Sequence, residues 1–172
     1  MRQELDRLLC EKYPKMMVNR NLPMTETCMC WGFDCGDGWY NILNQLMGNI
    51  QHHIDWKEKQ RNWNTEWNKE HPDEPRVIPE SIPQVTLDQI KEKFGTLRFY
   101  YTGGDDIIDG MVRMAESMSG CTCEECGNIG KSRGGGWIHT YCESCETKRE
   151  LAQKKASEEY EFKKLLKEGS EQ

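Results

Sequence analysis

Two Cys-x-x-Cys pairs near the C-terminus carry the clearest chemistry in this sequence. The first pair is Cys123 and Cys126, and the second is Cys142 and Cys145. A gap of two residues lets both thiolates of a pair reach one ion, and four thiolates suit the tetrahedral coordination of Zn²⁺. The spacing therefore predicts a structural zinc site, because four thiolates leave no position for water or substrate.

Two neighbouring residues leave the exact ligand set open. Cys121 precedes Cys123 by two positions and His139 precedes Cys142 by three, so either one could replace a cysteine of the pairs. A one-residue gap makes a poorer chelate than a two-residue gap, which favours the two Cys-x-x-Cys pairs. The alternative to a metal site is four buried free thiols, and it requires the double spacing to be chance.

A second cluster of potential ligands lies nearer the N-terminus. Cys28, Cys30 and Cys35 are close in sequence, and His52 and His53 follow on the next predicted helix. Together they could form a second metal site, although Cys-x-Cys is a weak signal. Cysteines of this kind more often pack as small hydrophobic side chains.

A predicted β-hairpin over residues 84–102 carries a second kind of chemistry. Its apolar and polar residues alternate, which places Arg98 and Tyr100 on the face opposite the apolar side chains. Lys91 and Lys93 join this face across the turn. Cations beside an aromatic ring suit a phosphate with a base stacked alongside, and we predict ligand contacts here. The alternative is a solvated face.

The elements that must position these residues follow from periodicity. Helices are predicted over residues 2–13, from Trp39 onward, and from Asp105 or Asp106 to about Ser119. Four of the six prolines fall in residues 71–83, which indicates an extended connector. The sequence thus predicts an α+β protein, with helices packed on a β-hairpin or small antiparallel sheet.

The same patterns predict the domains and some finer details. We expect a core domain over 1–119, a zinc-ribbon-like module over 120–146 and a charged helix over 147–172. The long helix is expected to continue its buried face through Trp56, Trp63 and Trp67. The third helix is expected to bury Ile107, Ile108, Met111 and Met114, and Asp37 is expected to be an N-cap.

Composition limits the classes of function. The net charge of −6 argues against broad nucleic-acid binding, which needs a surplus of Lys and Arg. The N-terminus lacks the apolar core of a signal peptide, and no apolar stretch is long enough to cross a membrane. We therefore expect a cytoplasmic protein without membrane partners, in which the nine cysteines stay reduced and favour zinc over disulfides.

Several motifs resemble, in the same order, those of a family of small uncharacterised proteins of tailed bacteriophages. The resemblance covers roughly residues 30–145. It is carried by residues 36–39 (Gly-Asp-Gly-Trp), 90–100 (Ile-Lys-Glu-Lys-Phe-Gly-Thr-Leu-Arg-Phe-Tyr), 103–104 (Gly-Gly), 114–119, 123–127 (Cys-Glu-Glu-Cys-Gly) and 136–137 (Gly-Trp). It implies a phage origin and expression in the cytoplasm of a host bacterium.

The resemblance implies a non-enzymatic accessory protein that binds a host component. Such a protein would sequester a nucleotide signal or block a host protein, and so counter host defence. The alternative is a nucleic-acid-associated zinc-ribbon protein that modulates transcription, with Lys131 and Arg133 on phosphate and Trp137 stacked on a base. The other interpretation of these three residues is a flexible loop followed by a strand with Trp137 pointing inward.

Two further expectations concern catalysis and assembly. A nucleotide hydrolase is the third interpretation, but the sequence shows no recognisable nucleophile, phosphate-binding loop or open metal site. The charged C-terminal helix has a thin apolar stripe that suits docking on a partner or on another copy of this chain. The other interpretation is a solvated terminal helix.

Overall fold

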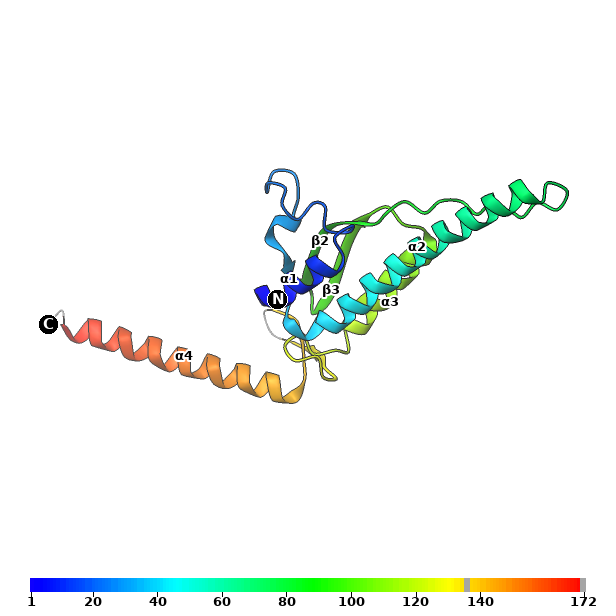
Figure 1. Cartoon of the computed structure of the whole chain (residues 1–172). Coiled ribbons are helices and arrows are strands. Elements are labelled where there is room, and N and C mark those ends of the chain that lie inside the picture. Colours follow the sequence, from blue (N-terminus) through cyan, green and yellow to red (C-terminus); the bar gives the residue numbers. More distant parts are fainter. Residues whose placement is uncertain (135–136, 171–172) are drawn as a thin grey trace.

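The computed structural model describes residues 1–134 and 137–170, without the side chains of 165 and 167–170. Residues 135–136, between Arg133 and Trp137 in the segment for which a flexible loop is one interpretation, therefore lie outside the described residues. So do residues 171–172 of the predicted C-terminal helix. The architecture is α+β, as the sequence predicts (Figure 1).

A three-stranded sheet forms the centre of the fold. Its strands are β1 (Phe33–Asp34), β2 (Thr86–Lys93) and β3 (Thr96–Thr102), in the order β1-β2-β3. β2 and β3 form the predicted antiparallel hairpin, whereas β1 runs parallel to β2. The turn is only two residues long, because Phe94 and Gly95 both take positive φ values, of 54° and 77°. This conformation matches the right-handed twist of the strands.

Within the described residues there are four α-helices, which surround the sheet or extend away from it. They are α1 (Gln3–Lys12), α2 (Tyr40–Glu70), α3 (Asp106–Ser119) and α4 (Glu143–Ser170). α3 lies along the edge of β3. The backbone N–H of Leu97 donates to Ser119 Oγ at 2.8 Å, and that of Phe99 donates to Glu116 Oε1 at 3.0 Å. These bonds satisfy donors of an edge strand that would otherwise face solvent.

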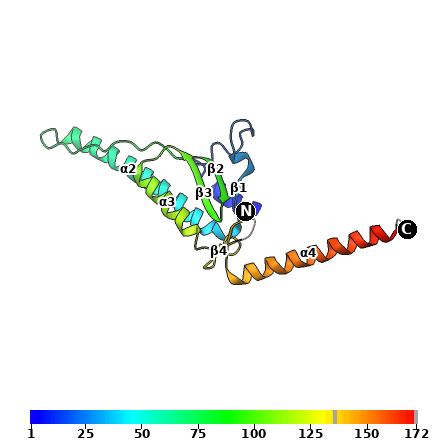
Figure 2. The same cartoon turned by 180° about the vertical axis from the view of Figure 1, so that it is seen from behind.

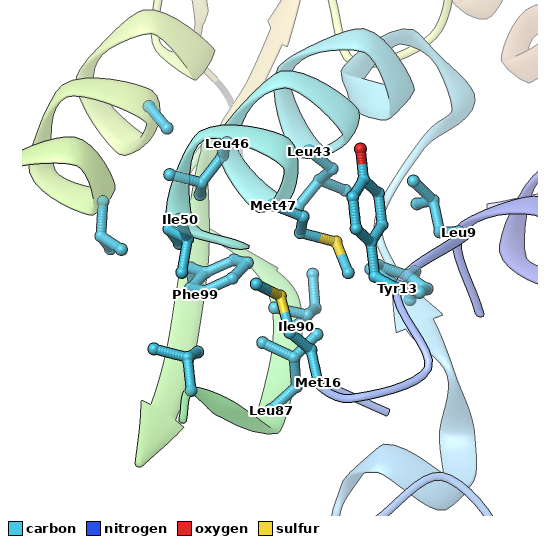
Figure 3. Packing of buried hydrophobic residues seen from close by; sticks show 14 of the residues in the cluster. Leu9, Tyr13, Met16, Leu43, Leu46, Met47, Ile50, Leu87, Ile90 and Phe99 are labelled. Atoms are coloured by element: carbon cyan, nitrogen blue, oxygen red, sulfur yellow. The ribbon is translucent and has the colours of Figure 1, made fainter. Parts of the chain in front are cut away.

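The hydrophobic core joins α1, α2, α3 and the sheet (Figure 3). Apolar side chains of α2 recur at helical spacing and pack on the alternate side chains of β2 and β3 that face them. The fully or almost fully buried members include Leu9, Met16, Trp39, Leu43, Met47, Ile50, Leu87, Ile90, Leu97, Phe99 and Ile108.

The core ends before α2 does. The last buried side chain of α2 is Ile54, whereas Trp56 is 51% exposed and Trp63 is 62% exposed. The expectation that these tryptophans continue the buried face is therefore wrong. The reason is geometric, because at 100° per residue Trp56 and Trp63 lie on the side of α2 opposite its buried residues. The distal half of α2 also extends past the sheet, as Figure 1 shows.

The burial of α3 also differs from the expectation in part. Ile108 is buried and Met111 packs against the core, but Ile107 and Met114 are exposed. The buried face of α3 runs through Ile108, Val112 and Ala115, which follows the helical period.

The proline-rich connector has no helix or strand and runs back along α2. Asn68 of α2 exchanges two hydrogen bonds with the backbone of Arg76, at 2.9 and 2.7 Å. Asn64 donates to the carbonyl of Val77 at 2.7 Å. Of the helices in residues 1–134 and 137–170, none combines the length and the apolar character that a membrane crossing requires.

Candidate metal centre

The structure brings the four cysteines of the two Cys-x-x-Cys pairs together. The sulfurs of Cys123, Cys126, Cys142 and Cys145 all lie within 4.8 Å of one another. The sulfurs of Cys126 and Cys142 are 3.6 Å apart. Among the described residues this is the one group of three or more potential ligands gathered so closely. The arrangement can hold a metal ion.

The first pair lies in a tight turn that the backbone closes. The N–H of Gly127 donates to the carbonyl of Cys123 at 2.8 Å, and the N–H of Cys123 donates to the carbonyl of Asn128 at 2.7 Å. Gly127 takes a φ of +78°, which glycine adopts without strain. This turn points both thiols of the pair to one side.

The second pair lies at the start of a helix. A small antiparallel ribbon, β4 (Lys131–Arg133) and β5 (His139–Tyr141), leads directly into α4. Cys142 precedes α4 and Cys145 lies in its first turn, so the helix begins at Glu143, four residues before the expected start at residue 147. The hydrogen bond from the backbone N–H of Cys145 lowers the pKa of Cys142 to about 7. Helix N-termini favour the thiolate in this way.

The turn of the first pair docks on the start of α2. A 3₁₀ turn over Asp37–Trp39 precedes α2. The N–H of Gly38 donates to the carbonyl of Glu124 at 2.7 Å, and the indole N–H of Trp39 donates to the carbonyl of Thr122 at 2.8 Å. A Cβ at position 38 would lie 2.1 Å from the carbonyl oxygen of Cys123. Glycine is therefore required here by close approach of two backbones.

This docking changes the interpretation of the Gly-Asp-Gly-Trp segment. Asp37 does not cap α2, since its carboxylate accepts the backbone N–H of Arg2 at 2.7 Å and pairs with the Arg2 guanidinium. The expected N-cap role is wrong. The segment instead joins the metal module to the core.

The residues that left the ligand set open lie outside the cluster. The thiol of Cys121 is exposed and donates to the carbonyl of Met118 at 3.2 Å. The ring of His139 stacks on Tyr141, with 5.1 Å between ring centres. The four cysteines are thus the group that the structure assembles.

The N-terminal cysteines and histidines do not form a second group within the described residues. Cys35 is buried in the hydrophobic core, and burial raises the pKa of its thiol to about 12. Cys30 donates to the carbonyl of Thr27 at 3.2 Å. His53 lies 2.9 Å from the carboxylate of Asp105. Each of these side chains thus contacts a different partner.

The hairpin face places most of its predicted residues side by side. Lys91 and Arg98 are directly opposite in the antiparallel register, and the Lys91 ammonium lies 5.5 Å from the centre of the Tyr100 ring. Arg98 donates to Thr96 Oγ1 at 2.6 Å. Lys93 lies at the turn end of the same face, over the Phe94 ring. None of these three cations forms an ion pair within the described part of the chain.

The basic residues of the metal module have acidic partners instead. Arg133 donates to Glu143 at 2.7 Å, and the Lys131 ammonium lies 3.8 Å from the same carboxylate. Trp137 is exposed, so the interpretation that places it inward is wrong.

Comparisons of the chain with protein-family models, with curated proteins and with solved structures found no match. The resemblance to tailed-phage proteins therefore receives no support from them.

Proposed function

We propose that this chain is a non-enzymatic binding protein that holds a phosphate-bearing ligand on the open face of its β2–β3 hairpin. The observation that carries the proposal is the cross-strand pair of Lys91 and Arg98 beside Tyr100. Two like charges directly opposite each other destabilise a sheet. Here no carboxylate among the described residues compensates them, although the chain as a whole is acidic.

The chemistry of this face suits a nucleotide. An Arg guanidinium and a Lys ammonium can both donate to one phosphate, and charge-assisted bonds of this kind are the stronger ones. The Tyr100 ring is 42% exposed and offers a surface for a base. Lys93 extends the positive face toward the turn.

We further propose that the metal ion of the cysteine cluster is zinc. Four thiolates at about 2.3 Å from Zn²⁺ in a tetrahedron stand about 3.8 Å apart. The 3.6 Å between the sulfurs of Cys126 and Cys142 is close to this value. A closed tetrathiolate site is structural, so zinc would hold the module and the start of α4 against the core.

The biological setting belongs to the same proposal. The phage resemblance would make the ligand a nucleotide signal of the host, and the protein a factor that sequesters it. A host protein is the other partner that this setting allows. Nucleic acid is less favoured, because the cations that would contact its phosphates, Lys131 and Arg133, already contact Glu143.

Isothermal titration calorimetry with adenine and guanine nucleotides tests the proposal. Native mass spectrometry of protein from bacterial cytosol would show any retained ligand. We expect Arg98→Ala to weaken the affinity at least about tenfold, since a charge-assisted bond contributes about 1.5–3 kcal/mol. Lys15→Ala is the matched control, because Lys15 pairs with Asp55 away from this face.

Two outcomes would contradict the proposal. One is a nucleotide affinity that is the same in the wild type and in Lys91→Ala/Arg98→Ala. The other is an absence of nucleotide binding combined with DNA or RNA binding that falls steeply with salt, which would favour the nucleic-acid alternative.

A further inference from the structure

Beyond Arg149, helix α4 has no buried side chain among the described residues. Every described side chain from Glu150 to Lys164 is exposed. Its 28 residues span about 42 Å at 1.5 Å per residue. Figures 1 and 2 show the helix extending away from the body.

One face of α4 combines apolar and acidic side chains. Leu151, Phe162 and Leu166 are all exposed, and Phe162 is 63% exposed. At 100° per residue these three fall on one side of the helix. Glu158 and Glu159 precede Phe162 by four and three residues, so their carboxylates flank its ring. Lys155 lies on the same side, two turns before Phe162, so the acidic character is confined to the turns around Phe162. We call the surface formed by Glu158, Glu159, Phe162 and Leu166 the acidic face of α4.

The distal half of α2 offers a surface of the opposite kind. A groove of about 250 Å³ is lined by Trp56, Lys59, Gln60, Trp63, Asn64 and Arg76. Trp56 and Trp63 are seven residues apart and therefore share one helix face. The charged residues that line the groove, Lys59 and Arg76, are both cations. We call it the tryptophan groove.

Contacts within the chain hold the groove in shape. The Arg76 guanidinium lies 3.7 Å from the centre of the Trp67 ring and 5.9 Å from that of Trp63. The connector that carries Arg76 is tied to α2 by Asn68 and Asn64. The indoles of Trp56 and Trp63 nonetheless remain more than half exposed. Exposed Trp with a positioned Arg is typical of the residues that dominate interfaces.

We propose that the tryptophan groove binds the acidic face of α4 from a second copy of this chain. Phe162 would lie between the indoles, while Glu158 and Glu159 would face Lys59 and Arg76. In this arrangement apolar side chains would contact apolar side chains, and carboxylates would contact cations. The proposal rests on residues other than those of the hairpin face, so either one can fail without the other.

The two surfaces cannot meet within one chain. α4 and the distal half of α2 leave the body on opposite sides in both views (Figures 1 and 2). A two-fold axis beside the body would instead bring each α4 onto the groove of the other copy. Both contacts would form in the same dimer, which would leave no groove and no acidic face free to bind a third copy.

The size of the contact predicts a reversible dimer. Large side chains that are half exposed can each bury on the order of 100 Å². With two such contacts the pair would bury about 1,000 Å², near the lower limit for specific interfaces. We therefore expect a dissociation constant in the micromolar range.

Sedimentation velocity of the full, metal-loaded chain from about 1 to about 200 µM tests the proposal. The wild type is expected to shift from monomer to dimer. Trp63→Ala and Phe162→Ala should each raise the dissociation constant at least about tenfold. Trp31→Ala is the control, because Trp31 is equally exposed but lies elsewhere, and it should leave the association unchanged.

Mixing the two variants gives the sharper result. Trp63→Ala keeps an intact α4 and Phe162→Ala keeps an intact groove, so the mixture should associate more tightly than either variant alone.

A wild type that is monomeric throughout would overturn the proposal. So would a dimer that Phe162→Ala abolishes and Trp63→Ala preserves, since two α4 helices would then pair directly. Growth beyond dimers would overturn the closed pair.

Discussion

At the scale of single residues, the four clustered cysteines differ from the other five in where their sulfurs point. Cys123, Cys126, Cys142 and Cys145 share one centre, whereas Cys121 bonds the carbonyl of Met118. Substitution of one ligand leaves three thiolates and a hydroxyl that binds Zn²⁺ poorly. We expect Cys126→Ser to lower metal affinity at least about a hundredfold, measured as metal content after dialysis against a competing chelator.

Cys121→Ser is the matched control for this experiment, since it removes a neighbouring thiol from the same turn region. It should retain one metal ion per chain. Loss of metal in Cys121→Ser with retention in Cys126→Ser would show that the ligand set is not the one that the sulfur positions indicate.

The clustering of these four cysteines could be predicted from the sequence because the geometry of a Cys-x-x-Cys pair is local and depends on few neighbours. The role of Gly38 could not be predicted in this way. Its lack of a side chain matters only because the carbonyl of Cys123 approaches it from 85 positions further along the chain. A glycine beside an aspartate also suits a cap or an anion site, and only the tertiary contact separates these roles.

At the scale of elements, the start of α3 depends on one carboxylate with two partners. Asp105 accepts the backbone N–H of Ile108 at 3.0 Å and lies 2.9 Å from His53 Nε2. Burial alone would raise the pKa of Asp105, but these hydrogen bonds outweigh it and the pKa is lowered. We expect Asp105→Ala to lower the free energy of unfolding by about 1–2 kcal/mol at neutral pH, measured by urea denaturation.

The pH dependence of this effect has a definite sign. A carboxyl whose pKa is lower in the folded chain stabilises the fold above its unfolded pKa of about 4. That stabilisation is lost as the pH falls through the lower folded pKa. The wild type and Asp105→Ala should therefore converge in acid. Asp106→Ala, which changes an exposed neighbour, should cost only a few tenths of a kcal/mol; an equal cost in both variants would argue against the cap.

The hairpin, the helices and the cap of α3 follow from periodicity and from local chemistry, so the sequence predicts them. The same periodicity excludes Trp56 and Trp63 from the buried face of α2, because at 100° per residue they lie on the side opposite its buried residues. Periodicity does not tell where the core ends, however. Asn64 and Asn68 do continue the buried spacing, but they bond the backbone of the connector. How far the buried face of a regular helix extends therefore depends on its neighbours, which the spacing within α2 does not contain.

At the scale of the whole molecule, the core and the metal module are held by different forces. The hydrophobic cluster runs from Leu9 to Ala115 and includes none of the four clustered cysteines. The module joins it through hydrogen bonds. The backbone N–H of Gly38 and the indole N–H of Trp39 donate to carbonyls of the module, and the hydroxyl of Thr140 donates to the carbonyl of Gly95. Such contacts contribute about 1 kcal/mol each, too little to order a small module without its metal.

Removal of the metal should therefore separate the two parts. After chelation under reducing conditions, we expect hydrogen exchange to rise at least about tenfold at the amides of residues 121–134 and 137–142, and at Gly38, which donates to the module. The amides of β2, β3 and the first half of α2 should keep their protection, because their burial does not involve the module. Since Cys142 directly precedes α4 and Cys145 lies in its first turn, chelation should also release the direction of that helix and weaken the proposed dimer. Unchanged exchange in the module would mean that hydrogen bonds and packing hold it without metal, whereas loss of protection throughout β2 and β3 would mean that the core depends on the ion as well.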